Sequence, residues 1–181
     1  AVVRYNANGT PDQGFGTGGI VTTDLGTRSD DARAIAIQPD GKVVVAGTAG
    51  DAGDDIALVR YLSDGHPDTS FGQAGVRITH LGSDAVANGV ALTASGQILV
   101  AGYTLGPKIN RDFLLARYTA DGTLDTTFGD HGAVRTDLGS GDDLVGSSRD
   151  VLLLFEKASR RAGRRYGGDD ERDGPGVATK R

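Results

Sequence analysis

The feature that most constrains this 181-residue chain is an internal repeat with a period of about 56 residues. Three dipeptides, Arg-Tyr, Phe-Gly and Leu-Gly, each occur three times, and each recurs after 56 and then after 57 residues. Because all the markers share one register, they indicate repeated structural units and not chance similarity. The copies are Arg4-Tyr5, Arg60-Tyr61 and Arg117-Tyr118; Phe15-Gly16, Phe71-Gly72 and Phe128-Gly129; and Leu25-Gly26, Leu81-Gly82 and Leu138-Gly139.

Each unit has the pattern of short β-strands separated by tight turns. The apolar runs are rich in Val, Ile and Leu and are bounded by Gly, Asp and Asn, which is typical of strands. The Asp-Gly turn in residues 38–42, and its counterpart in 93–97, predict hairpins. Strands are predicted to begin near residues 2, 20, 33, 43, 56, 76, 88, 98, 113 and 133, which gives four strands per unit.

Four antiparallel strands in a unit of this length match a β-propeller blade, a sheet that repeats around a channel and packs against its neighbours. A blade covered on both faces explains why Val43, Val44 and Val45 are apolar at successive positions instead of alternating. We therefore predict an all-β fold, a partial β-propeller of about two and a half four-stranded antiparallel blades. An atypical, partly disordered C-terminal tail is predicted to follow them.

Composition agrees with a turn-rich β protein and excludes several other classes. The chain has 29 Gly, and Asp supplies 22 of its 24 acidic residues, which favours turns over helices. The absence of Cys excludes disulfides, thiolate metal sites and a Cys nucleophile. No apolar run approaches the ~18–20 residues of a membrane span, and no signal-peptide pattern is present.

Several motifs in a fixed order resemble the delta-60 repeat of bacterial proteins. Arg-Tyr is followed by Asp-Gly, Asp and Phe-Gly, then by Asp-Leu-Gly and by Pro-Asp-Gly-Lys-Val-Val-Val-Ala-Gly, and residues 1–143 carry this order. The resemblance implies a β-propeller-like fold in a large secreted or surface protein. It brings no established catalytic residues.

The repeat breaks down after Asp143. Residues 1–143 carry 10 Lys and Arg against 18 acidic residues, whereas residues 144–181 carry 9 against 6. A further unit would continue with an Ala-rich strand, a Pro-Asp-Gly-Lys turn and a Val-Ala-Gly strand, and the sequence supplies none of them. We therefore predict β-propeller-like repeats over 1–143 and a divergent basic tail over 144–181.

Three interpretations of this tail stay open. In the first, the tail is a frameshifted or chimeric end. In the second, it is a terminal cap in which residues 151–155 form an edge strand or a short helix. In the third, Arg160, Arg161, Arg164 and Arg165 form a basic segment that contacts nucleic acid or an anionic surface. Interleaved acidic residues argue against the third, so no nucleic-acid partner is expected. From about residue 163 onward we expect disorder.

The most regular polar motif is the turn between the third and fourth strands of each unit. Its Gly, and the Asp three residues later, are consistent either with calcium binding or with turn geometry. The spacing lacks the alternating acidic residues and distant Glu of an EF-hand. We favour a structural role, with Gly in a left-handed conformation and Asp capping backbone N–H groups. The residues are Gly9, Gly65, Gly122, Asp12, Asp68 and Asp125.

Aromatic residues are predicted to pack between and within the blades. The glycine-rich residues 14–19 resemble a phosphate loop, but no Lys-Ser/Thr pair and no helix follow them, which excludes that function. We predict that Phe15, Phe71 and Phe128 are plugs between neighbouring blades. Tyr5, Tyr61 and Tyr118 are predicted to pack at strand ends.

Acidic residues in loops are the remaining candidates for a cation site. A ring of carboxylates at one face of a propeller would bind calcium, but a solvated acidic surface is the simpler interpretation and the one we favour. His66, His80 and His131 have no metal-binding spacing. Asp30 and Asp31 are predicted to precede a strand. We therefore expect no cofactor, with calcium as the alternative, and its candidate ligands are Asp51, Asp54, Asp55, Asp142 and Asp143.

Repetition also bears on function, because catalysis needs a set of residues unique to one unit and the polar markers here recur in every unit. We favour a non-enzymatic β-propeller repeat scaffold or binding module of a secreted or surface bacterial protein. The alternatives are a fragment of a propeller enzyme, such as a lyase or hydrolase, and a calcium-stabilised adhesion module.

The expected partners follow from the number of blades. A closed propeller has about 4–8 blades, more than this chain supplies, so its end blades would leave apolar faces and strand edges open. We expect these ends to contact neighbouring propeller blades or further copies of the chain. A protein or a glycan is the expected ligand.

Overall fold

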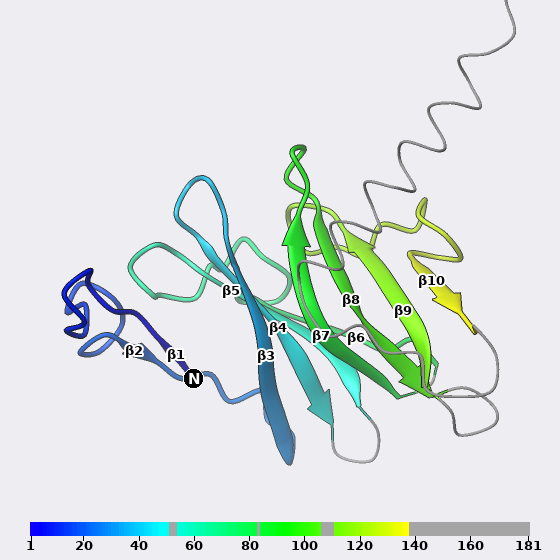
Figure 1. The fold of residues 1–181 in the computed structure, drawn as a ribbon, viewed down its shortest axis with the longest axis horizontal. Coiled ribbons are helices and arrows are strands. Elements are labelled where there is room, and N and C mark those ends of the chain that lie inside the picture. Colours follow the sequence, from blue (N-terminus) through cyan, green and yellow to red (C-terminus); the bar gives the residue numbers. More distant parts are fainter. Residues whose placement is uncertain (51–53, 83, 106–110, 138–181) are drawn as a thin grey trace, which may run out of the picture.

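The computed structural model describes residues 1–50, 54–82, 84–105 and 111–137 (Figure 1). Within these ranges the chain forms ten β-strands, and each begins at the predicted position or within four residues of it. The strands are β1 (Val2–Val3), β2 (Ile20–Val21), β3 (Ser29–Ile37), β4 (Val43–Gly50), β5 (Asp55–Tyr61), β6 (Val76–Thr79), β7 (Ala85–Leu92), β8 (Ile98–Leu105), β9 (Arg111–Tyr118) and β10 (Ala133–Thr136).

The strands form two complete four-stranded antiparallel sheets and one strand pair. The complete sheets have the orders β3-β4-β5-β6 and β7-β8-β9-β10, so each is a meander of sequential strands. The repeat register places β1 and β2 in the positions of β5 and β6, which makes the pair the second half of a blade. Figure 1 shows the half-blade and the two blades following one another along the long axis of the molecule.

Tight turns join the strands in the same way in each unit. In the turn between β3 and β4 the backbone N–H of Gln38 donates to the Lys42 carbonyl at 2.8 Å, and in the next blade Thr93 donates to Gln97 at 2.9 Å. Between the third and fourth strands the N–H of Leu62 donates to the His66 carbonyl at 2.8 Å. Each of these hydrogen bonds joins two residues of the same unit.

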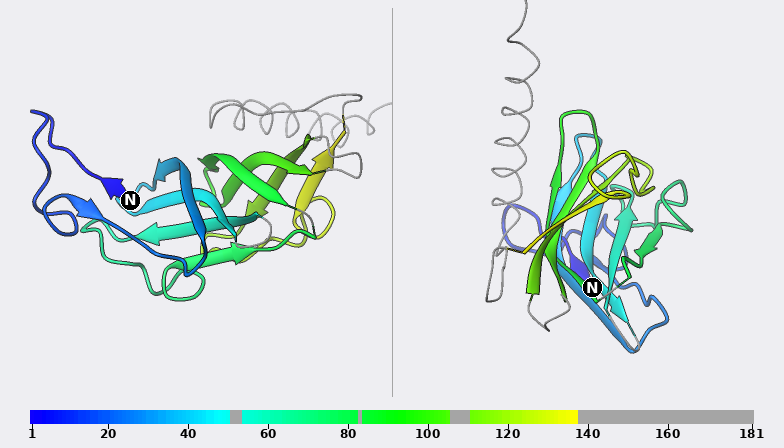
Figure 2. Two further views of the ribbon diagram at one scale, coloured as in Figure 1. Left: turned by 90° about the horizontal axis from the view of Figure 1, so that it is seen from below. Right: turned by 90° about the vertical axis from the view of Figure 1, so that its right-hand side faces the viewer.

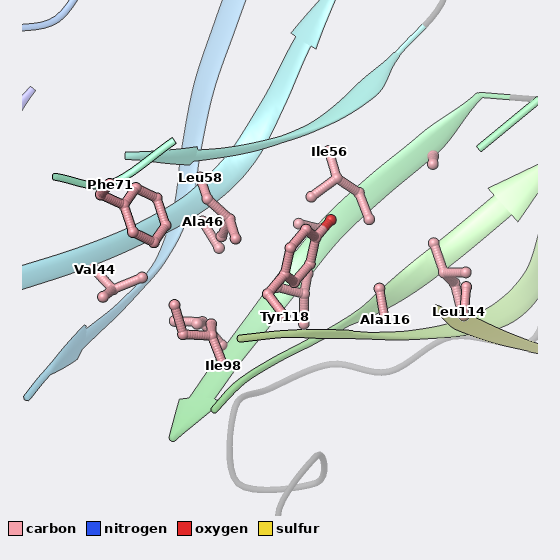
Figure 3. Packing of buried hydrophobic residues seen from close by; sticks show 14 residues of the cluster. Val44, Ala46, Ile56, Leu58, Phe71, Ile98, Leu114, Ala116 and Tyr118 are labelled. Carbon is pink, nitrogen blue, oxygen red and sulfur yellow. The ribbon is translucent and has the colours of Figure 1, made fainter. Parts of the chain in front are cut away.

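The main core lies between the two complete blades. Val44, Ala46 and Leu58 of one blade face Ile98, Val100 and Tyr118 of the next, all buried (Figure 3). Alternate residues of β4, Val43 and Val45, point to the opposite face and pack with the half-blade. Both faces of β4 are therefore covered, which is the physical reason for its unbroken apolar run.

Two further clusters flank this core. Phe15, Val43, Val45, Val59 and Tyr61 pack with the half-blade residues Val2 and Val21. On the far face of the β7–β10 blade, Ala91, Leu99, Ala101 and Leu115 form a buried cluster against which Phe113 and Phe128 pack. The second view of Figure 2 shows the two blades packed face to face as twisted layers.

Strand β3 begins earlier than predicted, which corrects the position of Asp30 and Asp31. Both residues lie inside the strand, where Asp30 pairs with Ala49 and Asp31 with Thr48. Because β3 is an outer strand of its sheet, these exposed carboxylates remain solvated while their backbone groups complete the ladder. A register shift between Ala32 and Ala34, repeated between Ala87 and Gly89, was not predicted.

The tail over residues 144–181, for which a frameshifted end, a cap and a basic segment were considered, lies outside the described residues. In the part of the chain that the structure describes, no helix is long and apolar enough to cross a membrane.

Candidate functional site

The most elaborate polar arrangement in the structure is a latch that joins one blade to the next. In the β3–β6 blade it consists of Arg60, Asp68 and Phe71. The Arg60 Nε lies 2.9 Å from Asp68 Oδ2, and its guanidinium carbon lies 4.5 Å above the centre of the Phe71 ring. The Arg60 Nη1 then donates to the backbone carbonyl of Ala120 in the next blade at 2.5 Å.

The turn that receives this latch belongs to the following unit. The backbone N–H of Gly72 donates to the Asp121 carbonyl at 3.0 Å, and Arg77 Nε donates to the Gly122 carbonyl at 2.9 Å. Gly122 has a φ of +84°, and a Cβ atom there would lie 2.6 Å from the Phe71 ring. Glycine is therefore required at this position both by the backbone conformation and by the aromatic ring.

The same latch occurs between the half-blade and the β3–β6 blade. Arg4 Nε lies 2.9 Å from Asp12 Oδ2, and the Arg4 guanidinium carbon lies 4.5 Å from the centre of the Phe15 ring. Arg4 Nη1 donates to the Ser63 carbonyl, and the N–H of Gly16 donates to the Asp64 carbonyl at 2.7 Å. Two successive junctions thus use equivalent atoms.

A third copy of the latch stands at the end of the β7–β10 blade. Arg117 Nε lies 2.8 Å from Asp125 Oδ2, and its guanidinium carbon lies 4.6 Å from the centre of the Phe128 ring. Within the described ranges, no backbone carbonyl accepts from Arg117 Nη1 and none accepts from the Gly129 N–H. The latch is therefore assembled here without a receiving turn in those ranges.

Asp68 is the most strongly held carboxylate of the three latches. Burial alone would raise its pKa, but the Ser70 hydroxyl and N–H, Lys42 and Arg60 together lower that pKa to about 2. The two Ser70 groups contact Oδ1 at 2.6 and 3.1 Å, and Lys42 Nζ lies 3.2 Å from Oδ2. In the next blade, the Thr127 hydroxyl is the main cause of the lowered pKa of Asp125.

The three Asp residues also cap their own turns. Asp12 Oδ1 accepts from the Gly14 N–H at 2.9 Å, and Asp68 and Asp125 each accept from the N–H two residues later at 3.1 Å. The preceding glycines, Gly9 and Gly65, have φ values of +84° and +90°. Each of the repeated Gly and Asp residues is therefore part of turn geometry, and each Asp is also the partner of a latch Arg.

The repeated aromatic residues differ in burial according to their position in the molecule. Phe15 and Phe71 are fully buried between units, whereas Phe128 is half-buried. Tyr61 and Tyr118 are the last residues of β5 and β9 and are buried, which agrees with the predicted packing at strand ends. Tyr5 is 61% exposed, which corrects its predicted packing. The difference follows from Tyr5 lying on the open side of the half-blade.

The predicted calcium ligands are only partly within the described residues. Asp51, Asp142 and Asp143 lie outside them. Asp55 is the first residue of β5, not a loop residue, and its Oδ1 lies 2.7 Å from His80 Nδ1. Across residues 1–50, 54–82, 84–105 and 111–137, no three His, Asp or Glu side chains gather in a way that would hold a metal ion, and Asp54 joins no such group.

Sequence reasoning used the recurring Arg-Tyr pair as a repeat marker and missed the role of the Arg. Arg60 lies on the blade face opposite Tyr61, and only 5% of it is exposed. The signal was the strict co-occurrence of Arg, the Asp eight residues later and the Phe eleven residues later in every unit. A cation that recurs with an acid and an aromatic residue in fixed register indicates a shared packing unit.

These sheets and latches define a partial β-propeller with repeated, nearly equivalent junctions between blades, and the predicted all-β fold class is confirmed. Residues 1–15, 38–71 and 93–128 match the family described as "Domain of unknown function (DUF5122) beta-propeller". The matches support a β-propeller repeat family of unknown function. A search of curated proteins found no significant match.

Proposed function

We propose that the chain is a non-enzymatic β-propeller repeat scaffold or binding module of a secreted or surface bacterial protein. The observation that carries this proposal is the use of the repeated polar residues. Arg60 binds Asp68 and a backbone carbonyl of the next blade, and the corresponding Arg and Asp of the other two units form the same internal pair. Groups consumed by packing are not free to react with a substrate.

A scaffold is supported by the two junctions, which reproduce the same contacts. Each blade is therefore joined to the next in the same way. In repeat architectures stability is close to a sum of unit and junction contributions. Resemblance to delta-60 repeats is what favours a bacterial secreted or surface protein.

Insertion of one additional repeat unit tests the scaffold proposal. A duplicate of residues 29–84, placed directly after residue 84, adds one β3–β6 blade in register. The scaffold predicts that the urea m-value and the free energy of unfolding both rise, because more apolar surface is buried. A matched control carries Ala at the Phe71 position of the inserted copy and should lose most of the gain.

An insert that leaves the m-value unchanged, or lowers the free energy of unfolding, would show that the units are not interchangeable and would contradict the proposal. Detection of the protein on intact cells of the source bacterium, compared with lysed cells, tests the surface location separately.

A further inference from the structure

The two ends of the described chain carry the two halves of one junction. At the N-terminal end, the turn of the half-blade has the form of the turns that receive a latch inside the molecule. Gly9 corresponds to Gly65 and Gly122, and all three have φ between +84° and +90°. Gly65 and Gly122 are buried under Gly16 and Phe71, whereas a Cβ atom at Gly9 would meet nothing within 4 Å.

The apolar side of the half-blade is open in the same way. Val3, Tyr5 and Ile20 are 43%, 61% and 46% exposed. Their counterparts in the β7–β10 blade, Ala116, Tyr118 and Ala133, are all at most 5% exposed because the preceding blade covers them. No group in the described ranges donates to the backbone carbonyls of Ala7 and Asn8, which correspond to the latch acceptors Ser63 and Asp64.

At the other end, the latch of the β7–β10 blade is complete and lacks a receiving turn within the described ranges. Phe128 is half-buried and Gly129 is exposed. Arg117 already has its Asp125 and Phe128 partners in place, so the group needs no rearrangement before it docks. A preorganised surface of this kind loses less entropy on binding than a flexible one.

From this pairing we propose that the Arg117 latch of one molecule docks on the half-blade turn of a second copy. By analogy with the internal junctions, Arg117 Nη1 donates to the Ala7 carbonyl of the second copy and the Gly129 N–H donates to its Asn8 carbonyl. The Phe128 ring covers Gly9 and packs beside Tyr5, as Phe71 covers Gly122 and packs with Tyr118.

This interface joins two different surfaces, so it is heterologous, or head-to-tail. Every copy that uses its latch still presents an open half-blade turn. Association therefore continues until a ring closes or a filament grows, and it does not stop at a symmetric dimer.

Two variants, each disabled at one end, test the arrangement in the full chain. Gly9→Ala places a methyl group where the Phe128 ring would lie, and Gly26→Ala is its matched control, because Gly26 has a φ of +78° and equally open surroundings. Arg117→Gln removes the latch donor, and Arg33→Gln is the control for loss of an exposed Arg. Circular dichroism checks that each variant folds, and Phe128→Leu replaces Arg117→Gln if that variant does not.

Sedimentation equilibrium over a range of concentrations supplies the readout. The native chain and both controls should associate, while Gly9→Ala and Arg117→Gln should each weaken association at least about tenfold. An equimolar mixture of the two disabled variants should form a one-to-one dimer and nothing larger, because only one working junction remains.

Three results would overturn the proposal: a native chain that stays monomeric at every concentration, disabled variants that associate like the native chain, or a mixture that forms no dimer. None of them decides the unit-insertion test, so the scaffold proposal stands or fails separately.

Discussion

At the scale of single residues, the latch shows how a buried ion pair is made tolerable. Removing Arg60 and Asp68 from water carries a desolvation cost, which only good geometry and further hydrogen bonds offset. Asp68 meets this condition, since Ser70 satisfies Oδ1 while Arg60 and Lys42 contact Oδ2. The equivalent pair Arg4 and Asp12 is about one-third exposed and needs less support.

Protonation of Asp68 should make the free energy of unfolding depend on pH within a specific range. Its pKa is lowered from 3.8 to about 2 on folding, so the unfolded chain binds the proton more readily than the folded one. The resulting stabilisation, about 2 kcal/mol, is present above pH 4 and is lost as the pH falls towards 2. Urea unfolding at several pH values should show this loss in the native chain.

Asp68→Asn is the variant that isolates the effect. It should lower the free energy of unfolding at pH 7 by about 3 kcal/mol, because Arg60 remains buried without its counter-charge. Its stability should then change less between pH 4 and 2 than that of the native chain. Asp12→Asn, at the exposed equivalent position, should cost less than half as much; equal costs for the two variants would contradict the assigned role of burial.

Tyr118 presents the opposite case, a buried polar group without a partner. Burial raises the pKa of its hydroxyl to about 12, opposed in part by the Arg77 charge. Among the described residues, neither the Tyr118 hydroxyl nor the Thr79 hydroxyl has a hydrogen-bond partner. An unsatisfied buried hydroxyl is costly, so its removal is expected to be harmless.

Tyr118→Phe should therefore leave the free energy of unfolding at pH 7 unchanged or raise it by up to about 1 kcal/mol. In the native chain stability should fall as the pH rises from 10 towards 12, because the unfolded state loses the phenolic proton first. That fall should be smaller in the variant. Chemical denaturation at neutral and alkaline pH measures the effect at pH 7 and the pH dependence. A loss above about 1 kcal/mol at pH 7 would contradict the expectation that removal of the hydroxyl is harmless.

At the scale of strands and turns, short apolar runs and the turn residues between them made most of the fold predictable. All ten strands were expected from short apolar runs between Gly and Asp turns, and the structure has them. The early start of β3 was missed because Asp30 and Asp31 are poor strand residues. An outer strand tolerates them, since one of its edges faces no partner strand.

Contacts between units were harder to predict than the strands. The half-burial of Phe128 and the exposure of Tyr5 depend on which unit lies next to them, which the local sequence does not encode. The latch depends on Arg60 reaching a carbonyl 60 residues away along the chain. Such a contact is set by blade stacking, and its signal in the sequence is the fixed spacing of Arg, Asp and Phe in every unit.

Phe71 and Phe128 occupy the same position in the loop between the third and fourth strands of successive blades, but they differ in burial. Substitution of one is therefore a control for substitution of the other. Phe71→Ala should lower the free energy of unfolding by about 3–5 kcal/mol, because the ring is fully buried in the main core. Phe128→Ala should lower it by less than about 2 kcal/mol, since that ring is half-buried. Urea unfolding of both variants checks the order, and the reverse order would contradict the junction as described.

At the scale of the whole molecule, the main core contains residues of both complete blades, so the two blades share it. Of the predicted calcium ligands, Asp54 and Asp55 lie within the described ranges, and the Asp54 backbone carbonyl accepts from the Ala85 N–H of the next blade at 2.7 Å. The Asp55 carboxylate pairs with His80 of its own blade, and the described contacts between blades are apolar packing, Arg-centred latches and backbone hydrogen bonds. The architecture therefore rests on packing and latches.

Calcium is accordingly expected to have no effect on the stability of the molecule. The melting temperature should be the same in excess EDTA and in excess calcium chloride, with magnesium chloride as the control for ionic strength. A calcium-specific rise in the melting temperature would show that an acidic site stabilises the chain and would revive the calcium-stabilised module.

The blades are joined by latches that dock on glycine turns, and one pair of glycine variants tests this junction. Gly122→Ala and Gly9→Ala impose the same backbone strain, since both residues have a φ of +84°. Only Gly122 lies against a phenylalanine ring of the preceding blade, 2.6 Å from the position of an added Cβ atom. The added clash should cost about 1–3 kcal/mol beyond the shared strain.

The measurement is the free energy of unfolding in urea, made at a concentration low enough to keep the chain monomeric. We predict that Gly122→Ala is destabilised more than Gly9→Ala by that amount. Equal destabilisation of the two variants would mean that the Phe71 latch does not dock on the Gly122 turn, and the proposed junction between blades would be wrong.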